Sequence, residues 1–137
     1  MDVVFYYKKQ EKFCPALRYF TKKIEKSELK KERKESILTD IDNKIMHAKS
    51  VNGRPDGGIL KPIKGYSLIE IKSEKNESTQ IRILYATYQD KLILLDAFEK
   101  PRNYKLKGQR KVEERYDIAE RYYKDFKNNP KSYKKYE

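Results

Sequence analysis

The spacing of apolar residues changes once along this chain, and that change limits the folds that the chain can form. Before residue 52 the apolar residues recur three or four positions apart, which is typical of helices that bury one face. A cluster of asparagine, glycine, proline and aspartate at residues 52–58 should end the helical region. After this cluster the apolar residues alternate with polar ones, as they do in strands. The change of spacing predicts an α+β fold.

Two helices and a short strand are predicted before residue 52. Residues 3–7 are β-branched or aromatic, which favours a strand. The first helix should begin at Pro15, because proline fits the first turn of a helix, and Ser27 could cap the second helix. The buried helix faces are predicted from apolar residues at helical spacing, which are Leu17, Phe20 and Ile24 in the first helix and Ile37, Leu38, Ile41, Ile45 and Ala48 in the second.

Three strands joined by short turns are predicted after residue 58. They cover residues 66–72, 79–88 and 92–98, and polar turns lie at 74–78 and 89–90. Because consecutive strands joined by short turns pair with each other, this segment predicts a three-stranded antiparallel meander.

The register of the first two strands of the meander can also be predicted. Keeping the apolar side chains on one face puts Ile69 and Ile71 beside Ile81, Ile83 and Tyr85. The same register brings Glu70 across from Arg82, or nearly so, on the opposite face. We expect Arg82 to be exposed on that face.

A basic segment and a final helix complete the chain. Residues 99–111 contain six Lys or Arg and a single acid, Glu99, which we interpret as a basic loop. An Asn-Asn-Pro sequence at 128–130 should end the helix, and residues 129–137 should form a frayed basic tail. The helix itself is predicted from an apolar stripe that consists of Val112, Tyr116, Ala119, Tyr123 and Phe126.

Together these elements predict one domain at residues 1–128, which suits a chain of 137 residues with one modest core. The expected architecture is a small antiparallel sheet made of the N-terminal strand and the meander. Two N-terminal helices and one C-terminal helix should pack against this sheet.

The charge of the chain indicates a polyanionic partner. Lys and Arg number 33 against 21 Asp and Glu, so the net charge is +12. Residues 99–137 hold 13 Lys and Arg against seven Asp and Glu, which places half of the net charge in the last 39 residues. This excess of basic residues is unevenly distributed along the chain. It therefore indicates binding to a nucleic acid, most of all RNA, rather than charge that only keeps the protein soluble.

The remaining composition favours a cytoplasmic protein without a metal or membrane partner. No apolar run approaches the roughly 20 residues that span a bilayer. The only cysteine, Cys14, cannot form an intramolecular disulfide, which suits a reducing compartment. With one cysteine and one histidine, His47, we expect no metal site.

Four short motifs occur in order along the chain and carry a resemblance to a known family. They are a glycine–leucine–lysine segment at 57–65, a Glu-x-Lys strand at 70–72, an Arg-x-x-Tyr strand at 82–85 and a leucine-rich strand ending in Phe-Glu-Lys at 94–100. Their order over residues 3–127 resembles that of the RelE/ParE toxin superfamily, in particular its phage-derived, HigB-like branch. Asp96 stands where that family usually has histidine, and Glu99-Lys100 stands where it usually has a lysine pair.

The resemblance implies the toxin of a type II toxin–antitoxin system. Such a toxin is a ribosome-dependent endoribonuclease that cuts mRNA in the ribosomal A site and needs no metal or other cofactor. The ribose 2′-OH attacks the adjacent phosphate. A cognate antitoxin, commonly a small helix-turn-helix protein, holds the toxin inactive.

The resemblance also assigns roles to individual residues. Arg82 is expected to stabilise the transition state, because fixed cations aimed at developing charge contribute strongly to catalysis. Glu70 could orient Arg82 or act as a general base, and Lys100 completes the expected catalytic set. Contacts to RNA are expected from further basic residues and one tyrosine, which are Lys72, Arg102, Tyr104, Lys105, Lys107, Arg110 and Lys111.

Two other functions remain open at the level of the sequence. A ParE-like toxin inhibits DNA gyrase by binding it without catalysis, and the same fold serves both activities. The cations after Phe98 and the presence of Arg82 favour the nuclease. The residues at Asp96 and Glu99 keep a third alternative open, which is a nucleic-acid-binding protein without enzyme activity.

Overall fold

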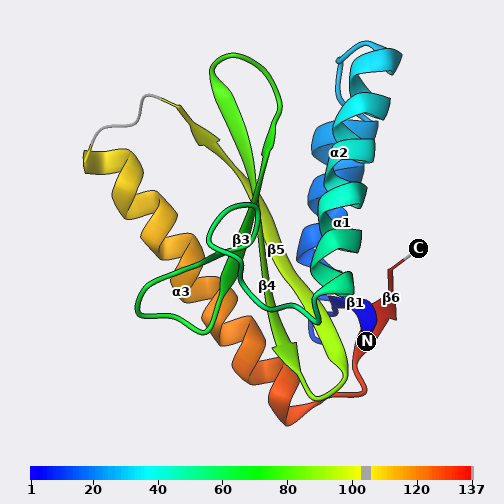
Figure 1. Cartoon of the computed structure of the whole chain (residues 1–137), viewed down its shortest axis with the longest axis vertical. Coiled ribbons are helices and arrows are strands. Elements are labelled where there is room, and N and C mark those ends of the chain that lie inside the picture. The colour runs from blue at the N-terminus through cyan, green and yellow to red at the C-terminus, as the bar shows by residue number, and fades with distance from the viewer. Residues whose placement is uncertain (103–105, 137) are drawn as a thin grey trace.

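The chain folds into a six-stranded sheet that has helices on both faces (Figure 1). The computed structural model describes residues 1–102 and 106–136, with side chains described up to residue 102 and from residue 108 onward. In chain order the elements are β1 (Asp2–Tyr6), α1 (Pro15–Tyr19), the π-helical η1 (Phe20–Glu25), α2 (Lys31–Ser50), β2 (Lys61–Pro62), β3 (Ile69–Glu74), β4 (Thr79–Tyr88), β5 (Lys91–Pro101), α3 (Leu106–Asn128) and β6 (Tyr133–Lys135).

The sheet is mixed, with the strand order β2-β3-β4-β5-β1-β6. Strands β3, β4 and β5 form the antiparallel meander that the sequence predicts. The prediction of a wholly antiparallel sheet is wrong, because β1 pairs with β5 in parallel. Parallel neighbours need a long connection, and the three helical segments and the first strands of the meander supply it.

The C-terminal tail forms a strand, so the prediction of a frayed tail is wrong. Residues Tyr133–Lys135 form β6, which pairs with β1 in antiparallel fashion. The ring of Tyr136 lies 5.5 Å from that of Phe5, centroid to centroid. The Tyr136 hydroxyl donates a hydrogen bond to Asp42 on α2 at 2.6 Å. Aromatic and hydrogen-bond contacts therefore order a segment that is too short and polar to show a strand pattern.

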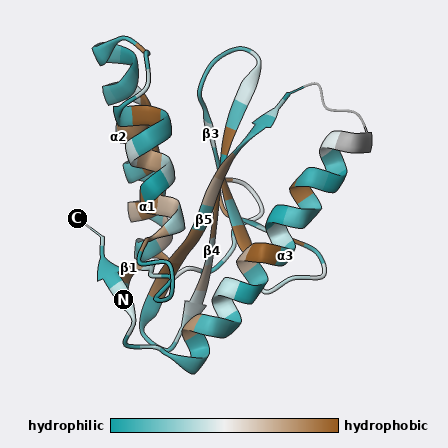
Figure 2. Cartoon of the chain, turned by 180° about the vertical axis from the view of Figure 1, so that it is seen from behind, coloured by the Kyte–Doolittle hydropathy of each residue, from teal (hydrophilic) through white to brown (hydrophobic). Residues whose placement is uncertain are grey.

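Each face of the sheet carries its own hydrophobic core, and Figure 2 shows the apolar residues gathered in the central strands between the helices. On the face covered by α1, η1 and α2 the predicted register is confirmed, with Ile71 opposite Ile83 and Ile69 opposite Tyr85. The other face is covered by α3 through its predicted apolar stripe, in which the buried residues are Val112, Ala119 and Phe126.

Two helix starts differ from the prediction. Helix α2 begins after Lys30, because the Ser27 hydroxyl donates to the carbonyl of Ile24 and so closes the preceding helix instead. Helix α3 begins at Leu106, inside the segment that was predicted as a basic loop, since leucine, lysine, glutamine and arginine all favour helix. Within the described ranges no helix is both long and apolar enough to cross a membrane.

Gly53 occupies a position at the end of the α2 region that other residues do not fit. Its φ is +74°, and a Cβ there would lie 2.3 Å from Cγ2 of Thr87. The carbonyl of Gly53 also accepts a hydrogen bond from the buried Tyr85 hydroxyl at 3.1 Å. Gly53→Ala is therefore expected to lower the free energy of unfolding by about 2 kcal/mol, because backbone strain and the clash act together.

Gly57→Ala is the matched control for this substitution. Gly57 also has a positive φ of +78°, but a Cβ there would meet nothing within 4 Å. Only the backbone strain remains, so we expect a loss of about 1 kcal/mol. Urea unfolding of both variants, followed by circular dichroism, gives the difference. Equal losses would contradict the close packing of Gly53 against Thr87.

Candidate nucleic-acid interface

A row of cationic side chains crosses the face of the sheet that α3 partly covers. Residues paired across neighbouring antiparallel strands point to the same face. Lys72 on β3 is paired with Arg82 on β4, and Gln80, two residues before Arg82, is paired with Lys100 on β5. Lys61 on β2 belongs to the same face. We call Lys61, Lys72, Arg82 and Lys100 the cation row.

Arg82 and Glu70 form a buried ion pair within this face. They are diagonal neighbours on β4 and β3, as the predicted register requires, and Arg82 Nη1 donates to Glu70 Oε1 at 2.6 Å. Arg82 Nη2 donates to Gln80 Oε1 at 2.9 Å. The guanidinium is therefore held in one orientation, and its Nε–H is a buried donor without a partner among the described residues.

The prediction that Arg82 lies on an exposed face is wrong. Only 5% of Arg82 and 1% of Glu70 are exposed. Tyr116 belongs to the apolar stripe of α3, and packing of that stripe on the sheet brings its hydroxyl over the ion pair. This hydroxyl donates to Glu70 Oε2 at 2.8 Å. Both oxygens of Glu70 therefore accept hydrogen bonds, one from Arg82 and one from Tyr116.

Lys72 has an unusual electrostatic environment for a lysine. Burial lowers the pKa of its ammonium, and the neighbouring charge of Arg82 lowers it further. Lys61 and Lys100 act in the same direction, and Glu70 opposes them. The other three cations of the row are therefore close enough to repel the charge of Lys72, and an anion such as a phosphate would relieve this repulsion.

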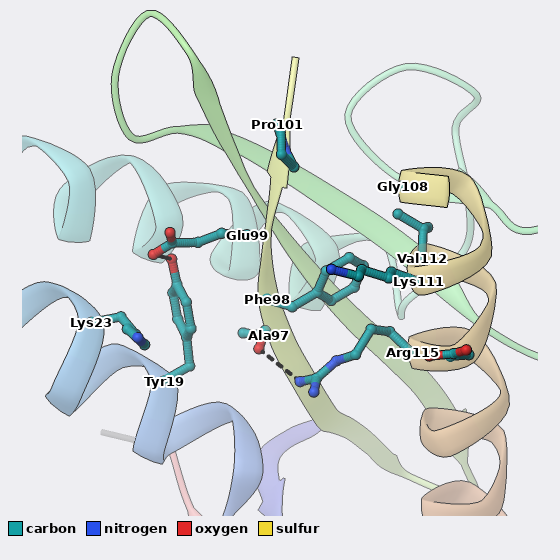
Figure 3. Close-up of a pocket in the computed structure, with 11 residues that line it drawn as sticks. Tyr19, Lys23, Ala97, Phe98, Glu99, Pro101, Gly108, Lys111, Val112 and Arg115 are labelled. Carbon is teal, nitrogen blue, oxygen red and sulfur yellow. Dashed lines mark hydrogen bonds between the residues drawn. The ribbon is translucent and has the colours of Figure 1, made fainter. Parts of the chain in front are cut away.

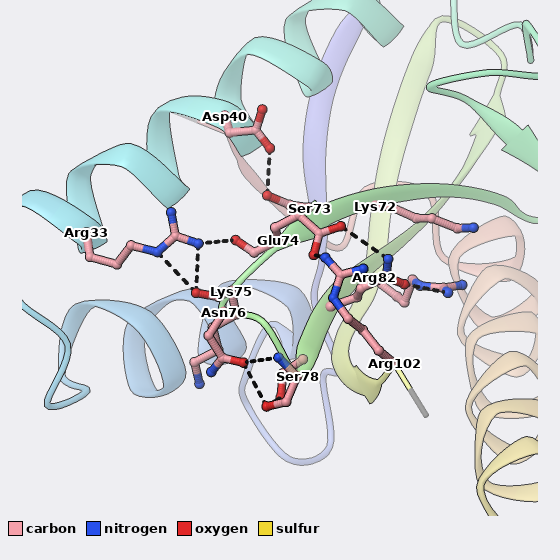
Figure 4. Close-up of polar contacts among 12 residues, drawn as sticks. Arg33, Asp40, Lys72, Ser73, Glu74, Lys75, Asn76, Ser78, Arg82 and Arg102 are labelled. Carbon is pink, nitrogen blue, oxygen red and sulfur yellow. Dashed lines mark hydrogen bonds and ion pairs between the residues drawn. The ribbon is translucent and has the colours of Figure 1, made fainter. Parts of the chain in front are cut away.

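Of the predicted residues at the end of β5, Lys100 belongs to the row and Arg102 follows it in the sequence. Lys100 is half-buried opposite Gln80. Arg102 forms an ion pair with Glu74, and its backbone N–H donates to the carbonyl of Ser78 at 2.9 Å. Figure 4 shows Lys72, Arg82 and Arg102 together on one side of the β3–β4 hairpin. The structure therefore brings Arg82, Glu70, Lys72, Lys100 and Arg102 into one region.

The other predicted RNA contacts fall on or before α3. Tyr104 and Lys105 lie outside the described residues, and only the helical backbone is described for Lys107. Arg110 and Lys111 are exposed on the first turns of α3 rather than in a loop. Lys111 lines a groove, whereas Arg110 is exposed and does not line it.

This groove separates α3 from α1 and η1 and has a volume of about 800 Å³. Figure 3 shows Tyr19 and Lys23 on one side of it and Lys111 and Arg115 on the other. Its floor is the part of β5 at 97–101, beyond the last residue of β5 that pairs with β1. Apolar surface dominates the lining, and both cations and the acids Glu99 and Glu114 lie around it. We call it the α1–α3 groove.

A second buried carboxylate, Asp96, lies beside the α1–α3 groove. A bulge in β5 opposite the step from Leu84 to Tyr85 turns Asp96 toward the face that α3 covers. Arg115 Nη2 lies 2.7 Å from Asp96 Oδ2, and the N–H of Ala97 donates to Oδ1 at 2.9 Å. Burial raises the pKa of Asp96 to about 6, although Arg115 and the Ala97 N–H oppose the rise.

Sequence reasoning missed three parts of this region. Tyr116 was assigned to an apolar stripe, and its hydroxyl was the only sign that it could also bind a carboxylate. Lys61 lies on a strand of two residues, which is too short to show a pattern. The contact between Asp96 and Arg115 depends on the bulge in β5, for which the sequence carries no signal.

Comparison with known proteins assigns no family to the chain. No protein-family model matches it, and no curated protein or solved structure is significantly similar to it. The resemblance to the RelE/ParE superfamily therefore stays a prediction.

Proposed function

We propose that the chain is a toxin that binds RNA across the cation row and cleaves mRNA on the ribosome without a metal. The observation that carries the proposal is the fixed orientation of Arg82, whose guanidinium is held by Glu70 and Gln80 between Lys72 and Lys100. A guanidinium that is held in this way can meet the developing charge of a phosphorane without reorganising.

The chemistry divides among the residues of the row. The ribose 2′-OH attacks the adjacent phosphorus and gives its proton to a water molecule. A 2′,3′-cyclic phosphate forms as the bond from phosphorus to the 5′-oxygen breaks, and the 5′-oxygen leaves with a proton from the protein. Arg82 stabilises the added negative charge. Lys72 would donate the proton to the 5′-oxygen, and the lowered pKa of its ammonium, which makes it a better acid than an ordinary lysine, supports this role. Lys100 and Arg102 hold the neighbouring phosphates.

One observation favours a second candidate, which is RNA binding without cleavage. Only 6% of the Arg82 side chain is exposed, so a phosphate reaches the guanidinium only after Tyr116 and the turn of α3 that carries it move away. If α3 stays in place, the exposed parts of the row and Arg102 can bind a phosphate backbone but cannot cut it.

The proposal includes a cognate antitoxin as partner. The α1–α3 groove combines an apolar lining with three cations, Lys23, Lys111 and Arg115, against two acids, Glu99 and Glu114, so its charged rim is positive by one. An amphipathic segment that carries acidic residues fits both properties. Such a segment would also hold α3 against the sheet and keep Arg82 covered.

Expression from a tightly repressed promoter tests the proposal. Wild type is expected to arrest growth and to cut translated mRNA. Lys72→Ala/Lys100→Ala is expected to lower cleavage by about 10²–10³-fold, because two charges near the reacting phosphate are lost. Lys30→Ala/Lys31→Ala removes the same charge at the exposed start of α2 and serves as the matched control.

The other results of this experiment distinguish the alternatives. Growth arrest with intact mRNA points to a gyrase-type target. A folded wild-type protein that neither arrests growth nor cuts mRNA, but still binds RNA, supports the non-catalytic candidate. Equal loss of cleavage in both double variants contradicts a specific role for the cation row.

A further inference from the structure

A second hollow lies far from the cation row, at the β1–β6 edge of the sheet. Its volume is about 520 Å³. Three segments line it, which are the turn after β1, the helical segments α1 and η1, and β6. We call it the β6 pocket. It shares no lining residue with the α1–α3 groove, and none of the cation row lines it.

The charge of this pocket has one sign. Among its lining residues no Asp or Glu occurs, and five are Lys or Arg, namely Lys12, Arg18, Lys22, Lys26 and Lys134. Other lysines of the chain have acidic partners, such as Lys8 with Glu11 and Lys44 with Asp40. Within the described part of the chain none of the five pocket cations has an ion pair. Their mutual repulsion would be relieved by an anion with several charges.

The pocket also presents aromatic surface between these cations. Tyr7, Phe13 and Tyr133 line it, and each of these residues is partly exposed. The ring of Tyr133 packs against the core that α3 covers, with Lys91 Nζ 5.5 Å from its centroid, so the aromatic surface of the pocket comes from Tyr7 and Phe13. The guanidinium carbon of Arg18 lies 3.5 Å from the centroid of the Phe13 ring, which is a stacked cation–π contact. Cations that alternate with aromatic rings are the chemistry that binds single-stranded nucleic acid, because phosphates meet the charges and bases stack on the rings.

The walls of the pocket are fixed by the backbone. The N–H of Lys8 donates to the carbonyl of Phe13 at 2.7 Å, and the N–H of Lys12 donates to the carbonyl of Lys8 at 2.8 Å, so the turn is closed. Lys134 is paired with Phe5 in the β1–β6 ladder. Residues separated by more than a hundred positions thus meet in a preformed site, which lowers the cost of ordering on binding.

We propose that the β6 pocket is a second RNA-binding site, which takes a single-stranded segment independently of cleavage at Arg82. Phosphates would contact Lys22, Lys26 and Lys134, and a base would stack on Tyr7. A concave, ring-lined site fits a flexible strand, whereas a flat anionic membrane surface could reach only its rim. The β6 pocket would bind a part of the RNA that lies outside the part bound by the cation row. The total length of RNA in contact with the protein would then increase.

Fluorescence anisotropy on the full chain tests this proposal. The probe is a labelled single-stranded RNA of 12 nucleotides with 2′-O-methyl groups, which attack from the 2′ position cannot cut. Lys22→Gln/Lys134→Gln is expected to raise Kd about tenfold and to reduce the slope of log K against log salt by about 1.4, which is two phosphate contacts. Lys30→Gln/Lys31→Gln removes the same charge elsewhere and should change Kd less than about threefold.

Two further arms separate the sources of binding. A 4-thiouridine version of the RNA should crosslink on irradiation to a peptide that contains Tyr7. Equal weakening in both double variants, or crosslinks confined to β3–β5 and α3, would overturn the proposal. So would binding of phosphatidylserine vesicles that Lys22→Gln/Lys134→Gln abolishes while RNA affinity is unchanged. Because the probe cannot be cut, these results do not depend on whether the chain is a nuclease.

Discussion

Glu70→Ala is expected to lower the free energy of unfolding by about 3–5 kcal/mol, because it leaves a buried guanidinium without its counter-charge. Arg82 cannot turn toward water in response, since only 5% of the residue is exposed and Tyr116 lies over the pair. The remaining hydrogen bond to Gln80, at 2.9 Å, does not replace a carboxylate. Urea unfolding at neutral pH, followed by circular dichroism, measures the loss.

Two matched variants identify the cause of this loss. Glu70→Leu/Arg82→Met removes both charges and fills a similar volume, so we expect it to recover most of the stability. Tyr116→Phe removes a single hydrogen bond to Glu70 and should cost about 1 kcal/mol. A loss below about 1 kcal/mol for Glu70→Ala would mean that Arg82 reaches solvent. The original prediction of an exposed Arg82 would then be correct for the protein in solution.

Local patterns were sufficient to predict the meander and its register. The alternation at Ile69 and Ile71 admits one pairing that buries both residues, and that pairing also brings Glu70 to the diagonal of Arg82. The buried face of α3 could be predicted in the same way, because Val112, Ala119 and Phe126 recur at helical spacing. These features depend on residues that are near each other in the sequence.

Long-range pairing could not be predicted in the same way. The parallel contact of β1 with β5 joins Val3 to Leu92, and no spacing in the sequence specifies such a partner. Strand β6 has only three residues, and Lys134 and Lys135 make it look like a solvated tail. The prediction that Arg82 is exposed failed for a related reason. The burial of Arg82 depends on which face of the sheet α3 covers rather than on the sequence of the strand itself.

The two buried carboxylates of the sheet are both held by α3, and by consecutive residues. Tyr116 donates to Glu70, and Arg115 pairs with Asp96. The ring of Phe98 lies between these contacts, 6.4 Å from the Tyr116 ring and 5.5 Å from the Arg115 guanidinium. One helical segment therefore covers Arg82 and closes one side of the α1–α3 groove. A change in the charge of Asp96 should therefore affect both the cover over Arg82 and the α1–α3 groove.

Asp96→Asn is expected to change how stability depends on pH. Burial raises the pKa of Asp96 to about 6 in the folded protein, above its value of 3.8 in the unfolded chain. The folded state therefore binds more protons than the unfolded state between these values, and the stability from this group is lost as the pH rises through about 6. From pH 4.5 to pH 7.5 this contribution should fall by about 2 kcal/mol.

Urea unfolding of wild type and Asp96→Asn at these two pH values measures the effect. The asparagine does not ionise, so the difference in free energy of unfolding between the two proteins should shift by about 2 kcal/mol in favour of the variant from pH 4.5 to pH 7.5. Asparagine still offers one oxygen to the Ala97 N–H and to Arg115, which limits other losses. A gap that is constant with pH would show that Arg115 fully compensates the buried charge. In that case the turn of α3 that carries Arg115 and Tyr116 is fixed on the sheet regardless of pH, and access to Arg82 depends on a partner rather than on protonation.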